Sequence, residues 1–302
     1  MSGTTLPGTG EDDAQTLAVA IGVSERRLAR KESWRQIRRR PSFIIGVVIV
    51  TVWVVCALFP NVIAPYDPLN FRAGLNQPPS WDHPFGTDKG GRDVFSRVIA
   101  GARDVLRIAP LAALLGVIGG VILGMLMGYL RGRFDVVASR VVEAFISLPV
   151  VLLGLLAVTT LGNSNWVVIG VVATLFTPIV ARTVRAAVLA ERDLDYVTSA
   201  RLRGESGAFI MFREILPNVT GPIVVELTIR IGYAVFTVAT LSFLGAGPPP
   251  PSPDWGSQVS DNYNSIVAGF WWSTFFPAGA IASLVVAVNL IADSIQSVLG
   301  DS

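Results

Sequence analysis

The chain has 302 residues, of which 51% are hydrophobic and only 15% are charged, and this composition excludes an ordinary water-soluble protein. The net charge of +2 indicates no nucleic-acid partner, because the basic residues gather at the ends of apolar segments. Cys56 is the only cysteine, which excludes an intrachain disulfide and a CxxC metal or redox site.

Six segments are long and apolar enough to cross a bilayer as helices, which takes about 20 residues each. They lack the alternating polar positions of a membrane β-strand, so each segment has to satisfy its backbone polar groups within a helix. The predicted fold is therefore all-α, a polytopic membrane bundle with six transmembrane helices. We expect these spans at residues 42–62, 105–130, 136–161, 165–189, 221–245 and 271–299.

The distribution of basic residues predicts the orientation of the chain in the membrane. Seventeen of the 24 Lys and Arg residues precede the first span or flank the connections after the second and fourth spans, and five lie on the other side. Because positive charge is retained in the cytoplasm, both termini are predicted to be cytoplasmic. The chain then divides into a cytoplasmic segment 1–41, a first span 42–62, an extracytoplasmic segment 63–104 and a core of five spans at 105–299.

Several features within these segments predict local structure. Residues 92–107 have an apolar face and predict an amphipathic helix at the outer membrane interface. Pro149, Pro178 and Pro277 lie inside the third, fourth and last spans, where each predicts a kink. In the second span, glycines recur every fourth residue and predict the close approach of another helix, at Gly116, Gly120, Gly124 and Gly128.

Glu226 and Arg230 lie four residues apart in the fifth span, a spacing that lets the two side chains meet on one helix face. Charges inside a membrane are costly and often functional. Two interpretations stay open: a structural pair that neutralises itself, which we favour, and a contact to the substrate.

The connection between the fourth and fifth spans, residues 196–217, predicts a helix-turn-helix. Gly204 can end a first helix in the left-handed conformation, Ser206 can cap a second helix, and Pro217 can stop it. Four consecutive apolar residues, 209–212, give this connection more apolar surface than a free loop should expose. We therefore expect it to dock into a groove on a partner protein.

In this connection Ala200, Gly204 and the run Ile215-Leu216-Pro217 have the order and spacing of the EAA loop, so the chain resembles the permease subunits of bacterial ABC importers. Thr198 and Ser199 stand where that family usually has Glu and Ala. Segments 64–68, 83–97, 241–245 and 251–256 resemble the C-type subunit of the dipeptide, oligopeptide and nickel branch.

The resemblance implies a MetI-like permease core that forms half of the translocation path of an ATP-driven peptide importer in the bacterial plasma (inner) membrane. It implies as partners a sister B-type permease subunit, two ATPase domains or subunits, an extracytoplasmic solute-binding protein, the lipid bilayer and the peptide cargo. The residues expected to couple the path to the ATPase are Thr198, Ser199, Ala200, Gly204, Phe209, Phe212, Ile215, Leu216 and Pro217.

The sequence contains no phosphate-binding loop, since its only lysines, Lys31 and Lys89, follow no glycine-rich stretch. We therefore expect no enzyme activity and no cofactor in this chain, with ATP and Mg²⁺ on the partner ATPase subunits. His83 is the only histidine, which excludes a multi-histidine metal site.

The alternative function is an ion-coupled secondary transporter or a channel subunit, for which buried acids, matching halves with broken helices or a filter sequence would be expected. The cargo stays open among dipeptides, oligopeptides, metal chelates and modified peptides.

Overall fold

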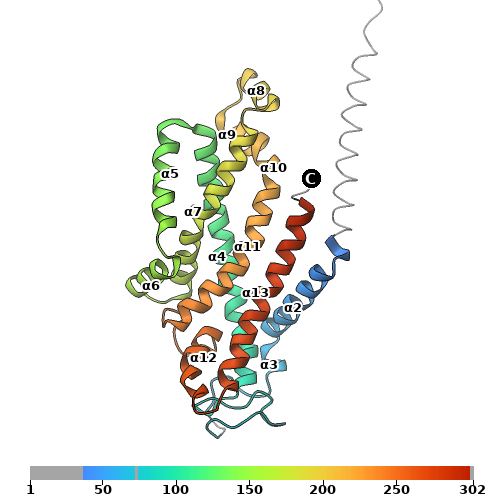
Figure 1. The fold of residues 1–302 in the computed structure, drawn as a ribbon, viewed down its shortest axis with the longest axis vertical. Helices are drawn as coiled ribbons and strands as arrows, with labels where there is room; N and C mark the ends of the chain where they lie inside the picture. Colours follow the sequence, from blue (N-terminus) through green and yellow to red (C-terminus); the bar gives the residue numbers. More distant parts are fainter. Residues whose placement is uncertain (1–36, 72–73, 300–302) are drawn as a thin grey trace, which may run out of the picture.

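The computed structural model describes residues 37–71 and 74–299, which form a bundle of long helices (Figure 1). The described residues contain no strand, in agreement with the all-α prediction, and most of the predicted segment 1–41 lies outside them. The helices are α2 (Pro41–Leu58), α3 (Pro60–Ile63), α4 (Val94–Leu130), α5 (Gly132–Ser147), α6 (Val150–Leu161), α7 (Asn165–Glu191), α8 (Asp195–Leu202), α9 (Gly207–Phe209), η1 (Ile210–Ile215), α10 (Leu216–Asn218), α11 (Thr220–Phe243), α12 (Trp255–Asn262), η2 (Tyr263–Ile266) and α13 (Trp272–Leu299).

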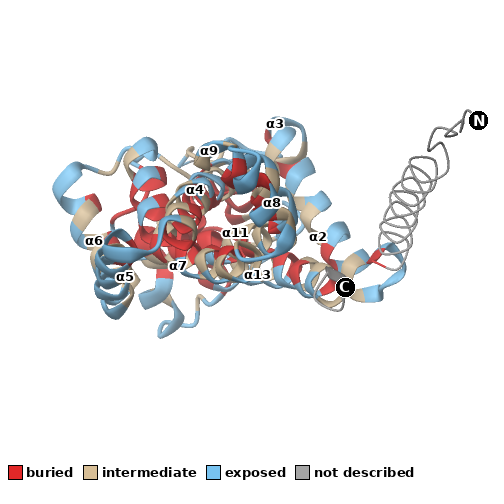
Figure 2. Ribbon diagram, turned by 90° about the horizontal axis from the view of Figure 1, so that it is seen from above, coloured by how far each residue is buried: buried red, intermediate tan, exposed pale blue. Residues whose placement is uncertain are grey.

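Five of these helices, α2, α4, α7, α11 and α13, are long and apolar enough to cross a membrane, and the number is six if the bent pair α5–α6 counts as one span. Buried residues gather around α4, α7 and α11, whereas α5 is largely exposed at one edge (Figure 2). Helix α13 packs between α11 and α2 on the other flank of α4.

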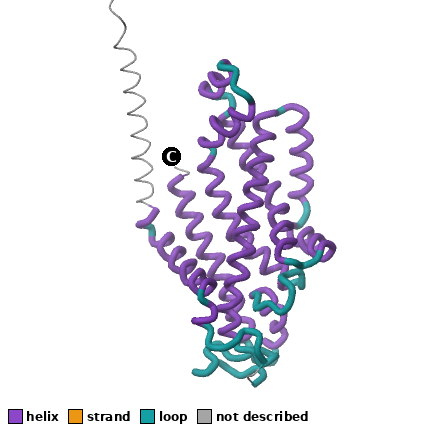
Figure 3. The backbone as a smooth tube through the Cα atoms, turned by 180° about the vertical axis from the view of Figure 1, so that it is seen from behind, coloured by secondary structure: helices purple, strands orange, loops and turns teal. Residues whose placement is uncertain are grey.

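The bundle has two distinct ends. Helices α8 to α10 lie together at one end, which we call the α8 end, and α12 lies at the opposite end with α3 and the loops that follow it (Figure 1). Figure 3 shows that most of the non-helical chain gathers at this α12 end. Trp255 of α12 is fully buried there, and its indole Nε1 donates to the backbone oxygen of Val98 at 2.8 Å.

The predicted close approach at the glycine stripe is confirmed, and the helix that approaches is α7. A Cβ atom added to Gly116 would lie 2.9 Å from the backbone oxygen of Ala173, and one added to Gly124 would lie 2.7 Å from that of Ala181. Real Cβ atoms do not come this near to a backbone oxygen, so only glycine allows the two backbones this separation.

The predicted amphipathic helix at 92–107 and the predicted second span at 105–130 form one continuous helix, so no helix end separates them. A single helix of 37 residues, α4, runs from Val94 to Leu130, so the non-helical segment ends at Asp93. The side chain of Asp93 caps this helix by accepting from the backbone N–H of Ser96 at 2.7 Å. No helix-ending signal follows, and the helix continues through Pro110.

The prediction that the third span is one helix at 136–161 is wrong. The chain forms two helices, α5 and α6, which meet at an angle of 90°. Pro149 explains the break, because a proline disfavours the helical conformation of the preceding residue. Leu148 is accordingly extended, with φ −91° and ψ 142°.

We predict that Gly124→Ala destabilises the protein, because the new methyl group forces α4 and α7 apart. Overpacking of this kind costs about 1–3 kcal/mol. The midpoint of thermal unfolding of the purified protein in detergent should fall.

Gly170→Ala is the matched control, because it makes the same change in α7 at a site where nothing lies within 4 Å of the added Cβ. The midpoint of this variant should stay the same or rise slightly. Equal midpoints for the two variants would contradict the close α4–α7 packing.

Candidate functional site

Residues 196–217, here called the coupling loop, fold at the α8 end of the bundle. Two hydrogen bonds close the first helix: Glu205 N–H donates to the oxygen of Ala200 at 3.2 Å, and Gly204 N–H donates to that of Arg201 at 3.0 Å. Gly204 has φ +77°, in the left-handed region that favours glycine. This pair of bonds is the Schellman motif of helix ends, so the predicted helix end at Gly204 is confirmed.

The second helix begins as predicted, with the Ser206 hydroxyl accepting from the N–H of Phe209 at 3.2 Å. It then widens into a π-helix, Ile210–Ile215, in which Leu216 N–H donates to the oxygen of Met211, five residues back. Pro217 favours this change because it has no N–H and its ring crowds the carbonyl four residues earlier. The helix ends one residue after Pro217, at Asn218.

The coupling loop has a buried face that holds it to the bundle. Ala200 and Ile215 are fully buried, and they belong to an apolar cluster with residues of α4 and α7. The other loop members of this cluster are Val197, Ile210 and Met211. The expectation that all of residues 209–212 are exposed is therefore wrong for Ile210 and Met211, which anchor the loop.

The opposite face of the coupling loop carries exposed apolar side chains. Phe209 and Phe212 are exposed, and Leu202 is 85% exposed. Four more of the predicted coupling residues, Thr198, Ser199, Gly204 and Pro217, are exposed as well, and Leu216 is half-buried. We call Leu202, Phe209 and Phe212 the apolar face of the loop.

Sequence reasoning missed Leu202, although a signal for it was present. Val197 and Ala200 are three residues apart and mark the inward face of α8. Leu202 lies four residues after Thr198 and three after Ser199, and each of these spacings places two side chains on the same side of a helix. Leu202 is thus the apolar member of an outward face that also presents Thr198 and Ser199.

Tyr129, near the end of α4, anchors the coupling loop through contacts with two arginines. The guanidinium carbons of Arg192 and Arg201 lie 5.9 and 5.6 Å from the centre of its ring. Arg192 Nη1 also donates to the backbone oxygen of Tyr129 at 2.6 Å. Within the loop, Arg203 and Glu214 form an ion pair at 3.3 Å that joins the two helices. These contacts tie the loop to α4 and α7 as one body.

Tyr196 adds a polar link to the end of α7. Its hydroxyl donates to the Glu191 carboxylate at 2.7 Å. Burial, together with this hydrogen bond, raises the pKa of Tyr196 to about 12. The phenol therefore stays protonated at physiological pH and remains a donor to Glu191.

Glu226 and Arg230 meet on α11, where Arg230 Nε donates to Glu226 Oε2 at 2.9 Å. The other carboxylate oxygen accepts from the hydroxyl of Thr183 on α7 at 2.8 Å. Both charged side chains are 11% exposed, and the Arg230 guanidinium lies over the rings of Phe176 and Tyr233. This geometry favours the interpretation as a structural pair, whose role stays a prediction.

Residues 37–71 and 74–299 include no group of three His, Cys, Asp or Glu side chains placed to hold a metal ion. The chemistry that the coupling loop offers is apolar contact with another surface. The loop is therefore a candidate docking site.

Comparison with known proteins identifies the family. The model described as "Binding-protein-dependent transport system inner membrane component" matches residues 120–301, and that for the "N-terminal TM domain of oligopeptide transport permease C" matches residues 29–79. A solved structure of the MetNI methionine ABC transporter, in inward-facing conformations, shares the fold. That match has a TM-score of 0.54 and 20% identity, and it covers 68% of this chain and 95% of the other.

Two curated relatives extend over nearly the whole chain. The dipeptide transport system permease protein DppC of Escherichia coli K12 is 39% identical over 280 residues, which cover 89% of this chain and 92% of the relative. The glutathione transport system permease protein GsiD of Shigella flexneri is 40% identical over 270 residues, which cover 89% of each chain. The chain therefore belongs to the inner membrane components of binding-protein-dependent transport systems, the membrane permeases of ABC importers.

Proposed function

We propose that this permease is a subunit of a peptide importer, that it forms half of the translocation path, and that the coupling loop docks on a separate ATPase. The proposal is based on the difference between the two faces of the loop. One face is buried against α4 and α7, and the other presents the apolar face Leu202, Phe209 and Phe212. A surface of this kind is stabilised when a partner groove covers it.

The cargo assignment rests on the relatives. Their names describe permeases for dipeptides and for glutathione, which is itself a small peptide. A short peptide is therefore the class of cargo that best fits this chain.

The proposed complex contains this chain, a sister B-type permease, two ATPase domains or subunits and an extracytoplasmic solute-binding protein. ATP and Mg²⁺ bind to the ATPase domains, and this chain performs no hydrolysis. The α8 end faces the cytoplasm, where the ATPase resides, and the α12 end faces the binding protein. Both termini are then cytoplasmic.

Coupling follows from the way the loop is held. Because Tyr129, Arg192 and the buried side chains fix the loop to α4 and α7, a movement of the ATPase surface is transmitted to both helices as a rigid displacement. The equilibrium between path conformations shifts only if the apolar face makes different contacts in the two states of the ATPase.

The proposed function is tested by reconstituting the complex in proteoliposomes with the solute-binding protein outside and ATP inside. We expect uptake of labelled dipeptides or glutathione that depends on ATP and on the ATPase subunits. Uptake by this chain alone under an ion gradient would instead support the secondary-transporter alternative.

The orientation is tested by cysteine labelling. Wild-type Cys56 is buried and should react little, so introduced cysteines report their own position. A membrane-impermeant maleimide added to spheroplasts without ATPase subunits should label Trp81→Cys at the α12 end. It should label Leu202→Cys only after permeabilisation, and the reverse pattern would contradict the proposed orientation.

The docking role predicts that Phe212→Glu lowers ATP-driven uptake by at least about tenfold. Its carboxylate would lose water on entering the apolar groove of the ATPase, and such burial without a partner costs well above 1.4 kcal/mol. The ATPase should also copurify with the variant less well.

Phe212→Leu is the matched control, because it keeps an apolar side chain at the same exposed position. Its uptake should stay close to that of the wild type, and the amount of either variant in the membrane should not change. Normal uptake by Phe212→Glu in the complete complex would refute the docking role.

A further inference from the structure

A groove of about 510 Å³ lies between α2, α4, α11 and α13. Residues of the apolar spans supply most of its lining, among them Val54 of α2, Ile231 of α11 and Val288 of α13. The hydroxyl of Thr228, which also lines it, donates to the backbone oxygen of Val224 at 2.9 Å. None of the described residues that line the groove is acidic. We call it the α2 groove.

Two arginines of α4, Arg103 and Arg107, supply the charge in this lining. Both are exposed, and neither forms an ion pair with an acid in the described part of the chain. Asp104, the nearest acid in the sequence, instead accepts from the hydroxyl of Ser252 at 2.9 Å. The two arginines are four residues apart, and like charges at this spacing destabilise a helix. An anion bound between them would remove this repulsion.

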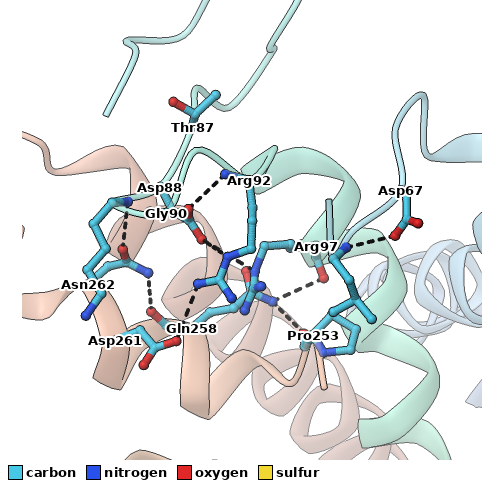
Figure 4. A network of polar contacts seen from close by, with 12 residues as sticks. Asp67, Thr87, Asp88, Gly90, Arg92, Arg97, Pro253, Gln258, Asp261 and Asn262 are labelled. Atoms are coloured by element: carbon cyan, nitrogen blue, oxygen red, sulfur yellow. Dashed lines mark hydrogen bonds and ion pairs between the residues drawn. The ribbon is translucent and has the colours of Figure 1, made fainter. Parts of the chain in front are cut away.

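Two further arginines, Arg92 and Arg97, show how the fold compensates such charges elsewhere. Arg92 Nε donates to Asp88 Oδ2 at 2.7 Å, and Arg92 Nη2 lies 3.6 Å from Asp261 (Figure 4). Arg97 Nε lies 3.8 Å from the same oxygen of Asp88. Acids of this chain therefore face Arg92 and Arg97, whereas the two arginines of the α2 groove are left without one.

The arginines of the groove lie at the level of the lipid headgroups. Residues 108–130 of α4 carry no charge. At about 1.5 Å per residue this stretch is roughly 35 Å long, slightly more than the roughly 30 Å of the hydrocarbon core. Arg107 therefore lies at the edge of the core on the side of the α12 end, and Arg103 lies one turn further out. Lipid phosphates occupy this level.

The fold holds the groove open, because α2 is fixed to α13. Trp53 Nε1 donates to the hydroxyl of Ser283 at 2.9 Å. A Cβ atom added to Gly46 would lie 2.6 Å from the backbone oxygen of Ala287, so the two helices touch through their backbones at this point. The wall that α2 provides is thus preorganised, and a ligand can enter without a rearrangement of the helices.

We propose that the α2 groove binds an anionic phospholipid of the leaflet at the α12 end, with Arg103 and Arg107 on its phosphate and one acyl chain along the apolar lining. A guanidinium is suited to phosphate in charge and in planar geometry. A helix of another protein would have to bring acids of its own to these arginines, whereas one lipid molecule supplies both the charge and the apolar chain. The proposal is independent of the cargo and of the coupling loop.

The test is native mass spectrometry of the full chain in detergent, titrated with dioleoyl phosphatidylglycerol or with dioleoyl phosphatidylcholine. The two lipids have the same acyl chains, but only the first has a net negative charge. We expect one phosphatidylglycerol molecule to bind at least about tenfold more tightly than phosphatidylcholine, since a hydrogen bond to a charged group contributes about that much. Inorganic phosphate should not displace it, and displacement would contradict the role of the acyl chain.

The combined substitutions Arg103→Gln and Arg107→Gln remove both charges and keep polar side chains at these exposed positions. We expect them to weaken phosphatidylglycerol binding by at least about tenfold and to change phosphatidylcholine binding little. The control combines Arg133→Gln and Arg213→Gln, which remove the same charge at exposed positions of the α8 end. Tight binding of phosphatidylglycerol should persist in this control.

Val54→Trp fills the groove while both arginines remain. Val54 is 38% exposed, so the larger ring occupies the groove and does not enter the core. We expect phosphatidylglycerol to bind this variant more weakly than the wild type. Val52→Trp is the matched control, because it adds the same ring to α2 at a 53% exposed position outside the lining. Its binding should equal that of the wild type.

Equal binding of phosphatidylglycerol to the wild type and to the variant without Arg103 and Arg107 would overturn the proposal, and so would equal binding to the two tryptophan variants. The titration is then repeated on the complete transporter, where retained binding is expected. Loss of the site in the complete transporter would mean that a partner subunit covers the groove in place of a lipid, and this result would also overturn the proposal.

Discussion

The close packing of α4 against α7 is the constraint on which the rest of the structure depends. The glycine stripe brings the two backbones so near that side chains of α7 fill the space where Cβ atoms would lie on α4. Without a hydrophobic driving force between helices in lipid, such close contact is a main source of association. The pair then serves as the frame against which α11, α5 and the coupling loop are placed.

Hydropathy predicted the approximate positions of five membrane helices, and of a sixth if α5 and α6 count as one span, because span length is set by the thickness of the bilayer. It could not place the helix ends. Helix α4 extends past its apolar part since Asp93 caps it and nothing interrupts the chain before the apolar stretch begins. The predicted third span bends at Pro149, where hydropathy alone cannot distinguish a kink from a complete break.

The coupling loop shows the same limit at the level of single residues. Gly204 and Ser206 were predictable because each acts through its own backbone or side chain. The π-helix was not, since it arises from the combined effect of Pro217 and the packing of Ile210, Met211 and Ile215. The contact between Tyr129 and Arg192 joins residues more than 60 positions apart in the chain, and no local pattern encodes such a contact.

Helix α4 connects the coupling loop to the α12 end of the bundle. It carries Arg97 in its first turn and Tyr129 next to its last residue, so about 55 Å of helix separates its two ends. A helix held along its length by close packing moves as a unit, whereas a flexible connection would absorb a displacement. Since Gln258 and Trp255 join α12 to α4, a displacement of the coupling loop along α4 carries α12 with it.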